Sequence, residues 1–280
     1  MPVAGGVRPP TQQKAYKMTS LDLTGRTAIV VGASRGIGLA ISQQLAAAGA
    51  SVVLTARTQE AAEEAAARVG DGALGVGAHA VDEDAARRCV DFTLERFGSV
   101  DILVNNAGTN PAYGQLIDQD HARFTKIFDV NLWAPLLWTS LVVKSWMGEH
   151  GGAVINTASI GGMHQSPAMG MYNATKAALI HITKQLALEL SPRIRVNAIA
   201  PGVVRTRLAE ALWRDHEDSL ASSIALGRIG EPIDVAGAVA FLVSDAASWI
   251  TGETMVIDGG LLLGPAQGFR AQPPTVTGPD

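Results

Sequence analysis

The sequence predicts an α/β fold in which helices cover both faces of one parallel sheet. Short apolar runs alternate with longer, Ala-rich segments from about residue 26 to residue 263, which is the pattern that parallel strands with crossover helices produce. Aromatic residues make up only 5% of the chain, whereas glycine occurs 30 times. That composition favours close packing of helices on a sheet over an aromatic-rich β-sandwich.

The apolar runs are the predicted strands. The first of them, TAIVVG, is apolar almost throughout, as expected for a strand that is buried on both faces. The later runs have the same character and come at regular intervals. The predicted strands are residues 27–32, 51–55, 75–80, 100–105, 153–157, 194–199 and 254–257.

The segments between these runs are the predicted helices. The first ends before Gly49, and glycine commonly terminates helices. Right-handed crossovers would then wind the chain into a doubly wound Rossmann fold with a seven-stranded parallel sheet. The predicted helices are residues 37–48, 59–69, 83–97, 124–147, 171–190 and 232–244.

Charge and cysteine content exclude several classes of function. A net charge of −4 and a pI near 5.9 argue against a nucleic-acid partner. The single cysteine, Cys89, excludes an intramolecular disulfide and a multi-cysteine zinc site, and the histidines lack metal-ligand spacing. No apolar run approaches the length needed to span a bilayer. We therefore expect a cytoplasmic protein with no metal and no membrane contact.

The chain is expected to form one domain. Residues 1–20 contain Gly, Pro, Gln and Lys without an apolar signal-peptide core, so they are predicted to be a disordered leader. No linker-like break interrupts residues 21–263, which are predicted to be a single catalytic domain. Residues 264–280 are rich in Pro and Gly and are predicted to be a flexible tail.

The clearest catalytic signal is the pair Tyr172 and Lys176. On a helix, side chains four residues apart share one face. A positive charge near a phenol is expected to lower its pKa toward neutrality, where tyrosine can act as a general acid or base. Because such pairs also occur by chance, the interpretation depends on the motifs around this one.

A glycine-rich turn, GASRGIG, joins the first predicted strand to the first predicted helix. Its glycines would allow a tight turn and a close approach to a pyrophosphate, and the helix N-terminus would supply N–H groups and partial positive charge. A purely structural turn is the alternative, but the position is the one that a dinucleotide site requires. The predicted contacts in this turn are Gly32, Ser34, Arg35, Gly36, Ile37 and Gly38.

Taken together, several motifs resemble the short-chain dehydrogenase/reductase family over residues 21–263. They occur in the family's order: the glycine-rich turn, NNAG at 105–108, Tyr172 with Lys176, PGVVRT at 201–206, and GET…DGG at 252–260. Within the family, the chain is most similar to reductases of the 3-oxoacyl-[acyl-carrier-protein] type. The resemblance implies hydride transfer between a nicotinamide cofactor and a ketone or secondary alcohol.

The resemblance also implies a catalytic set of four residues. Ser159 would orient the carbonyl, and Tyr172 would transfer the proton. Lys176 would hold the ribose hydroxyls and lower the pKa of Tyr172, while Asn131 would hold a water that links Lys176 to solvent. The alternatives are a turn residue at Ser159 and a helical residue with a satisfied amide at Asn131.

The expected cofactor is NADP(H). Ala56 stands where an acidic residue closes the second strand in NAD-binding members, so no carboxylate would repel a 2′-phosphate. Arg35 and Arg57 offer guanidinium groups to that phosphate, and His79 is expected beside the adenine. The remaining expected contacts are Asn105, Ala107, Gly108, Tyr172, Lys176, Pro201, Gly202, Val204 and Thr206.

The substrate is harder to predict, because residues 207–226 correspond to a flap that varies within the family. The resemblance suggests a 3-oxoacyl group carried on acyl carrier protein or CoA, with a steroid or xenobiotic carbonyl as the alternative. Carrier binding would need basic residues near the cleft, and the candidates are Arg193, Arg195, Arg205 and Arg207. A non-catalytic NADP-sensing regulator is the less favoured alternative, because Tyr172 and Lys176 are both present.

The helices predicted at 124–147 and 171–190 bear on assembly. The first, and the second from residue 179 onward, are apolar around most of their circumference, so both sides are expected to be buried. The resemblance implies a homotetramer in which these helices pack against a second subunit. Deeper burial within one chain is the alternative.

Overall fold

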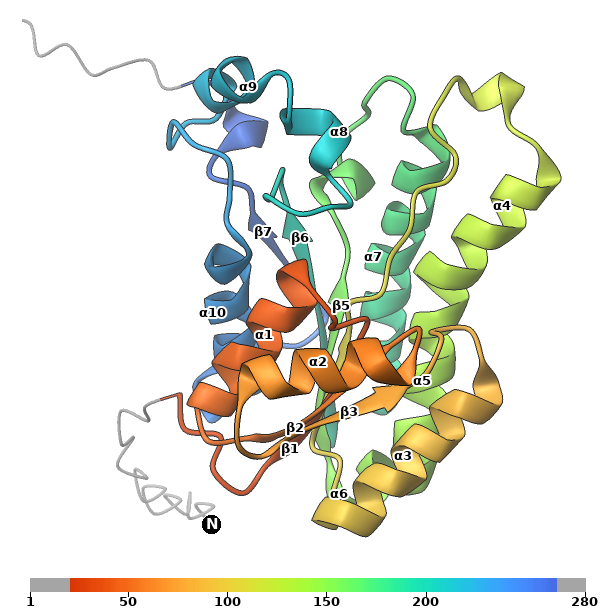
Figure 1. Ribbon diagram of the computed structural model, residues 1–280, viewed down its shortest axis with the longest axis vertical. Coiled ribbons are helices and arrows are strands. Elements are labelled where there is room, and N and C mark those ends of the chain that lie inside the picture. Colours follow the sequence, from red (N-terminus) through yellow and green to blue (C-terminus); the bar gives the residue numbers. More distant parts are fainter. Residues whose placement is uncertain (1–20, 266–280) are drawn as a thin grey trace, which may run out of the picture.

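The computed structural model describes residues 21–265. The predicted leader at 1–20 lies outside the described residues, and so do residues 266–280 of the predicted tail. The described part of the chain contains a seven-stranded sheet with helices packed on both faces (Figure 1). The predicted α/β architecture is confirmed.

All seven strands are parallel, in the order β3-β2-β1-β4-β5-β6-β7. The chain therefore runs from β1 outward to β3 and then returns to β4 on the other side of β1. This reversal is a topological switch point, where the carboxyl ends of neighbouring strands leave a crevice for ligands. The strands are Thr27–Val31, Ser51–Ala56, Ala73–Gly77, Ile102–Asn105, Gly152–Thr157, Ile194–Pro201 and Thr254–Ile257.

The helices form two layers on the sheet (Figure 1). Helices α1 (Gly36–Ala47), α2 (Gln59–Val69) and α10 (Pro232–Val243) pack on one face. Helices α3 (Glu83–Phe97), α5 (Ala134–Val142) and α7 (Gly170–Leu190) pack on the other. All five residues of β1 are buried, which explains why its sequence is a continuous apolar run rather than an alternating one.

Strand β3 occupies Ala73–Gly77 rather than the predicted 75–80, because its only neighbour sets its length. Strand β2 ends at Ala56, and Ala56 pairs with Gly77, so the residues beyond Gly77 have no strand to pair with. Strand β4 likewise begins at Ile102 rather than at the predicted residue 100. The carboxylate of Asp101 accepts a hydrogen bond from the Thr27 N–H at 2.8 Å just before that strand starts.

The helix predicted at 124–147 is a chain of shorter segments. Helix α4 (His121–Phe128) leads into a π-helical turn at Asp129–Trp133, and α5 leads into a second at Val143–Met147, before α6 (Gly148–His150). Pro135 lies in the first turn of α5 and has no N–H to continue an α-helical ladder. The preceding N–H, on Ala134, instead donates to the carbonyl of Asp129, five residues back. Such π turns are frequent at functional sites.

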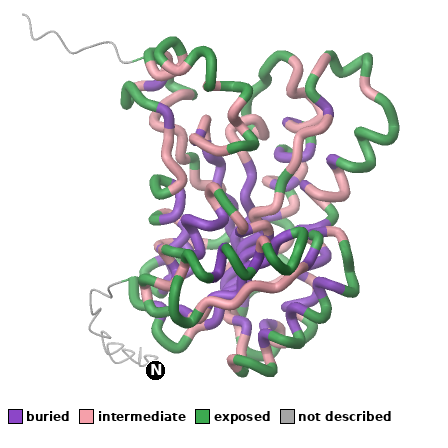
Figure 2. The backbone as a smooth tube through the Cα atoms, in the orientation of Figure 1, coloured by how far each residue is buried: buried purple, intermediate pink, exposed green. Residues whose placement is uncertain are grey.

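Burial differs between the two ends of the molecule (Figure 2). Buried residues gather around the sheet, whereas the segments beyond the strands' carboxyl ends are mostly exposed or half-buried. These segments include α4 and the two short helices α8 (Glu210–Trp213) and α9 (Glu217–Ser223). The site described below lies between the buried sheet and this more exposed layer.

Candidate active site

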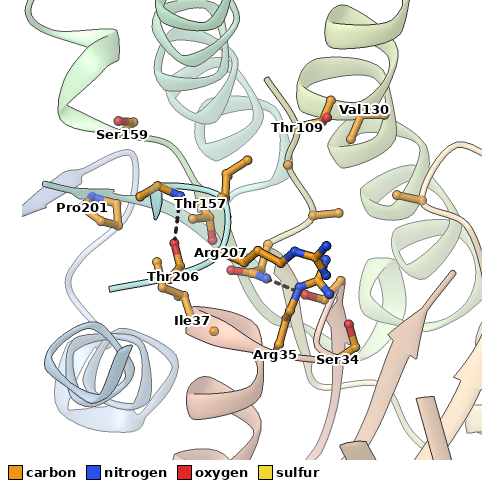
Figure 3. Close-up of a pocket in the computed structure, with 18 of the residues that line it drawn as sticks. Ser34, Arg35, Ile37, Thr109, Val130, Thr157, Ser159, Pro201, Thr206 and Arg207 are labelled. Atoms are coloured by element: carbon orange, nitrogen blue, oxygen red, sulfur yellow. Dashed lines mark hydrogen bonds between the residues drawn. The ribbon is translucent and has the colours of Figure 1, made fainter. Parts of the chain in front are cut away.

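A cavity of about 610 Å³ opens at the carboxyl ends of the strands (Figure 3). It follows the sheet order: residues after β3 and β2 line one end, residues after β1 and β4 the middle, and residues after β5 and β6 the other end. Helices α4 and α7 complete the wall. Most of the predicted site residues line it, namely Gly32, Ser34, Arg35, Gly36, Ile37, Arg57, His79, Ala107, Gly108, Ser159, Tyr172, Lys176, Pro201, Gly202, Val204 and Thr206.

The glycine-rich turn is held close to the loop that follows β4. Gly32 has φ +75°, and a Cβ at this position would lie 2.7 Å from the Cα of Ala107. Gly38 packs in α1 against the same region, where a Cβ would lie 2.4 Å from Nδ2 of Asn106 and 2.6 Å from the carbonyl oxygen of Gly32. Gly38 does not itself line the cavity. Its role is to let α1 approach the strand ends, which brings the helix N-terminus to the cavity.

The N-terminus of α1 is built to receive an anion. Helices α2, α3 and α4 are each capped by a side-chain oxygen, from Thr58, Asp82 and Asp120 respectively. No side chain among the described residues caps α1, and its first turn contains no acidic residue. The free N–H groups of such an end and its partial positive charge favour a phosphate group.

Asn105 and Asn106 have different surroundings, and the structure does not place the Asn105 side chain, a predicted cofactor contact, at the cavity. The buried Asn105 side chain points into the core, where its Nδ2 donates to Oδ1 of Asn156 at 2.9 Å and to Oγ1 of Thr139 at 3.2 Å. Asn106 lines the cavity instead, and its Nδ2 donates to the carbonyl oxygen of Gly32 at 2.8 Å. Neighbouring residues at a strand end point to opposite sides, so only one of them faces the cavity.

Ser159 and Tyr172 come together from different elements. Ser159 extends the end of β5, and its Oγ accepts the N–H of Gly161 at 3.1 Å. Tyr172 lies in the first turn of α7, and its phenol is within hydrogen-bonding reach of the Ser159 side chain. Gly161 makes room for this arrangement, because a Cβ there would lie 2.4 Å from Oδ1 of Asn173. Two hydroxyl groups therefore face one point in the cavity.

Lys176 lies one turn beyond Tyr172 on α7 and is buried. Its Nζ donates to the carbonyl oxygen of Thr157 at 2.7 Å and lies 5.6 Å from the centre of the Tyr172 ring. Burial lowers the pKa of the Lys176 ammonium to about 8. Lys176 is therefore held in a fixed position next to the phenol, although burial disfavours its charged form.

The pKa of Tyr172 shifts in the direction opposite to the predicted one. Burial, which disfavours the phenolate, raises the pKa of this hydroxyl above its usual value of 10.0, and the hydrogen bond with Ser159 opposes the rise. The nearby Lys176 does not reverse the effect of burial. At neutral pH the side chain is therefore a protonated phenol, which can donate a proton to an oxygen placed between it and Ser159.

Asn131 is fully buried in the π-helical turn and does not line the cavity. Its Oδ1 accepts the N–H of Thr109 at 2.8 Å, and its Nδ2 donates to the carbonyl oxygen of Thr109 at 2.9 Å and to Oγ1 of Thr175 at 3.1 Å. The amide is therefore satisfied within the protein. Through Thr109, Asn131 fixes the loop after β4, and through Thr175 it fixes α7 between Tyr172 and Lys176.

The loop after β6 forms the far wall. Pro201, Gly202, Val204 and Thr206 all line the cavity, as predicted. The N–H of Arg205 donates to the carbonyl oxygen of Gly230 at 2.8 Å, and the N–H of Gly230 donates to that of Val203 at 3.1 Å. These backbone bonds attach the loop to Gly230, in the segment that follows the flap, residues 207–226.

Arg205 fastens the flap from outside the cavity. Its guanidinium binds both carboxylate oxygens of Glu217 at 2.7 and 2.9 Å and Oε1 of Glu231 at 2.8 Å, and it lies 4.9 Å above the ring of Trp213. These groups raise the pKa of Arg205 above its usual range and lower that of Glu217. All of them are at the surface, so water and salt weaken the pairing.

The charges that line the cavity all have one sign. Among residues 21–265, five basic side chains line it and no Asp or Glu does, although the chain as a whole carries a net charge of −4. Arg57 and His79 follow β2 and β3 at one end, and Lys176 lies at the other. The five are Arg35, Arg57, Lys126, Lys176 and Arg207. A cavity of this kind suits a ligand with several negative charges.

Several residues that line the cavity were not predicted from the sequence. Asn106 belongs to the NNAG motif, but the predicted contact in that motif was its neighbour Asn105. Lys126 and Thr109 lie outside the motifs, and only the fold brings them to the cavity. Helical spacing could have indicated Lys126. It lies one turn before Val130, and both residues line the cavity. No pattern identified Thr157, whose carbonyl oxygen holds Lys176.

Comparison with known proteins agrees with the motifs. The sequence profile of the family described as Enoyl-(Acyl carrier protein) reductase matches residues 32–262. The chain belongs to the short-chain dehydrogenase/reductase family. It is therefore an oxidoreductase of a family that uses nicotinamide cofactors.

Relatives with similar sequences are named dehydrogenase/reductase SDR family member 4. The protein of that name from Caenorhabditis elegans is 42% identical over 247 residues, covering 85% of this chain and 95% of its own. The one from Homo sapiens is 40% identical over 250 residues, covering 87% and 90% of the two chains. The family assignment thus covers almost all of the described residues.

Solved structures of the family superpose closely. One is a short-chain dehydrogenase/reductase, glucose/ribitol dehydrogenase, from Brucella melitensis, with a TM-score of 0.82 and 31% identity over 86% of this chain and 98% of that one. Another is a short-chain type dehydrogenase/reductase from Mycobacterium marinum, with a TM-score of 0.81 and 35% identity over 86% and 97%. These values confirm the predicted Rossmann fold.

Two further observations concern residues 21–265 alone. In this part of the chain, no group of three or more His, Cys, Asp and Glu side chains is arranged to hold a metal ion. None of its helices combines the length and the apolar character needed to cross a bilayer.

Proposed function

We propose that this protein is an NADP(H)-dependent oxidoreductase that interconverts ketones and secondary alcohols. The observation that carries the proposal is the cavity itself. It joins a cationic, carboxylate-free channel at the ends of β1 and β2 to a pair of hydroxyl groups, on Ser159 and Tyr172, at the end of β5. The first part suits a dinucleotide and the second suits a carbonyl oxygen.

The preference for NADP(H) rests on the adenosine end of the cavity. Ala56 and Arg57 line it there, so a 2′-phosphate would meet a guanidinium rather than a carboxylate. Arg35 projects into the cavity from the glycine-rich turn and offers a second guanidinium to the cofactor's phosphate groups (Figure 3). His79 lines this end and supports the predicted contact with adenine. The uncapped N-terminus of α1 would hold the pyrophosphate.

The reactive end can be assigned residue by residue. The bound cofactor would supply the hydride. Ser159 would hold the carbonyl oxygen, and the protonated phenol of Tyr172 would donate the proton that this oxygen needs as it becomes a hydroxyl group. Lys176, held by the Thr157 carbonyl oxygen, would orient the ribose and place positive charge below the phenol. Val204 and Thr206 would hold the carboxamide of the nicotinamide ring.

The raised pKa of Tyr172 favours the reductive direction at neutral pH. In reduction the phenol must start protonated, and burial favours that form. In oxidation it must start as phenolate, which becomes available only at higher pH. The proposal therefore places the optimum for alcohol oxidation at a more alkaline pH than the optimum for ketone reduction.

The surface around the cavity favours a free carbonyl compound over a carrier-bound thioester. Three of the four arginines that could bind an acidic carrier have partners within the protein. Arg193 donates to the Gly148 carbonyl oxygen at 2.9 Å, Arg195 to that of Leu242 at 2.6 Å, and Arg205 is paired with carboxylates. Only Arg207 is directed into the cavity. Arg193 and Arg195 flank the start of β6, at the edge of the sheet opposite the cavity, so the four arginines do not form one basic surface for an acidic carrier protein.

The flap contributes apolar side chains as well as Arg207 to the cavity. Leu208 lines the cavity and is exposed, and Ala209 lines it beside Leu208. Apolar side chains at an entrance suit an apolar substrate. We therefore place a steroid-like or aromatic ketone ahead of the 3-oxoacyl thioester. A non-catalytic NADP-sensing role is disfavoured, because Ser159, Tyr172 and Lys176 are all present at the cavity.

Assembly as a homotetramer and location in the cytoplasm belong to the same proposal. The helical segments at 121–150 expose Phe124 and Trp133, and α7 exposes Leu188. Exposed large apolar side chains on these helices support their predicted packing against a second subunit.

The proposal can be tested with the purified protein and a substrate panel. NADPH and NADH would each be assayed with diketones, aromatic ketones, steroid ketones and 3-oxoacyl thioesters. We expect NADPH to be preferred, and free ketones to be reduced with higher kcat/KM than thioesters. Comparable kcat/KM for the two cofactors would contradict the NADP(H) assignment. A preference for thioesters would restore the carrier hypothesis, and binding of NADPH without turnover of any ketone would favour the regulator.

A further inference from the structure

Arg207 is a cation of the flap that no part of the predicted site accounts for. It directly follows Thr206 and lines the cavity together with Leu208 and Ala209. Within residues 21–265, its guanidinium forms no hydrogen bond or ion pair. The other two arginines of this region, Arg205 and Arg214, are both paired with carboxylates. Arg207 is thus the flap arginine that can bind a ligand.

The position of Arg207 is fixed by the residue before it. The Cγ2 atom of Thr206 lies 3.2 Å from the point that a Cβ on Gly36 would occupy. Gly36 is the first residue of α1, so the flap begins in contact with the N-terminus of that helix. Figure 3 shows the side chains of Arg207 and Arg35 extending into the same part of the cavity.

This part of the cavity is the expected place for a pyrophosphate. The sheet order puts the residues after β1 between those after β2, where Arg57 lies, and those after β5, where Ser159 lies. The α1 N-terminus supplies uncapped N–H groups from one side only. A guanidinium fits the other side, because its planar array of N–H donors matches two phosphate oxygens.

We infer that Arg207 binds the pyrophosphate of the cofactor from the flap side, opposite the α1 N-terminus. The inference rests on the proposed function, because it requires a dinucleotide in the cavity. Arg207 is then distinct from Arg57, which is proposed to meet the 2′-phosphate alone, whereas Arg35 extends into the same part of the cavity as Arg207 and can meet either phosphate group. Since both NADPH and NADH contain the pyrophosphate, Arg207 strengthens the binding of both, and it attaches the flap to whichever of them is bound.

The test is a titration of dinucleotide binding by calorimetry, which needs no turnover. Arg207→Gln removes the charge and keeps a polar side chain, and Arg207→Lys keeps the charge but not the planar donors. Arg214→Gln is the matched control, because Arg214 lies on the same flap, is paired with Glu210 and does not line the cavity. Each variant would be titrated with NADPH and with NADH, and its fold checked by thermal unfolding.

We expect Arg207→Gln to raise Kd for NADPH and for NADH by a similar factor, roughly tenfold, since a charge-assisted hydrogen bond to phosphate is lost. Arg207→Lys should give a smaller rise for both, and Arg214→Gln should leave both unchanged. Unchanged Kd values in Arg207→Gln would overturn the inference, and so would a loss confined to NADPH, which would move Arg207 to the 2′-phosphate. If the wild-type protein binds neither dinucleotide, the proposed function fails before this inference is reached.

Discussion

The strand ends and the flap form opposite walls of one cavity, and they are held by different forces. At the strand ends, buried hydrogen bonds fix functional groups, as in Asn131 to Thr175 and Lys176 to Thr157. In the flap, exposed ion pairs do so, as in Arg205 to Glu217. Figure 2 shows the same contrast, with buried backbone around the sheet and exposed backbone beyond it. The strand-end wall is therefore the rigid one, and the flap wall is the adaptable one.

A methyl group inserted at Gly38 should break the rigid wall most severely. In Gly38→Ala the new Cβ would lie 2.4 Å from Asn106 Nδ2 and 2.6 Å from the Gly32 carbonyl oxygen, neither of which can move freely. We expect unfolding in urea to show a loss of roughly 3 kcal/mol, together with much weaker NADPH binding.

The matched control is Gly237→Ala. Gly237 is also helical, in α10, but a Cβ there would have no atom within 4 Å. Because alanine favours helix over glycine, this variant should gain roughly 0.5–1 kcal/mol. Equal effects of the two changes on the free energy of unfolding would contradict the close packing of the glycine-rich turn.

Asn131→Leu should be nearly as damaging, and it tests whether buried polar bonds hold the wall. The change removes the buried hydrogen bond to Oγ1 of Thr175 and leaves the part-buried N–H and carbonyl oxygen of Thr109 without their side-chain partner. We expect a loss of roughly 2–3 kcal/mol in urea unfolding. The control Gln43→Leu removes an exposed amide that bonds the Arg68 carbonyl oxygen and should change little. A loss no greater than that of the control would show that the Asn131 bonds are not important for stability.

Lys176 gives the rigid wall a pH dependence. Burial lowers the pKa of this ammonium from 10.5 to about 8. Between these two pH values the unfolded chain binds a proton that the folded chain does not, so stability rises with pH. Relative to Lys176→Met, the wild-type protein should gain roughly 1–3 kcal/mol across that window in urea unfolding. A difference between the two proteins that stays constant with pH would show that the lysine titrates normally.

Arg205→Met should have the smallest effect on stability, because it acts on the exposed wall. It removes the ion pairs with Glu217 and Glu231 while keeping an apolar group over Trp213. We expect Tm to change little, KM for the ketone to rise, and high salt to raise KM in the wild-type protein in the same way.

Arg228→Met serves as the control for this change. Arg228 forms an exposed ion pair with Asp234 at the start of α10, away from the cavity lining. Its loss should leave KM unchanged. Two results for Arg205→Met would contradict this account: a drop in Tm as large as that of Asn131→Leu, or an unchanged KM. Either would show that the exposed ion pairs of Arg205 do not hold the flap as proposed.

What the sequence could predict depends on whether a feature follows from a local pattern or from tertiary contacts. The strands were found because buried parallel strands are continuous apolar runs, and Tyr172 and Lys176 because helical spacing puts them on one face. The choice between Asn105 and Asn106 depends on which side of a strand end faces the cavity, and neighbouring residues look alike in sequence. The sequence also does not show that Arg205 is paired with carboxylates, because its partners Glu217 and Glu231 are distant in the chain.

The pKa of Tyr172 could not be predicted for a different reason. The motif shows which charge lies nearby, but not how much water the fold removes from the phenol. In the structure, burial is the larger cause and it raises the pKa. The lengths of β3 and of the helix after residue 121 also depended on tertiary context, namely the end of β2 and the π turns around Pro135.

The most direct test of the central claim is the Tyr172→Phe variant, examined for both binding and turnover. The change removes the proton donor and keeps the ring, so NADPH should bind with a Kd close to that of the wild-type protein. Ketone reduction should fall by roughly 10²–10⁴-fold or more, as expected when a general acid is lost. A variant that binds NADPH normally but no longer turns over ketone would support the account. A variant that still reduces ketones at a rate near that of the wild-type protein would contradict it.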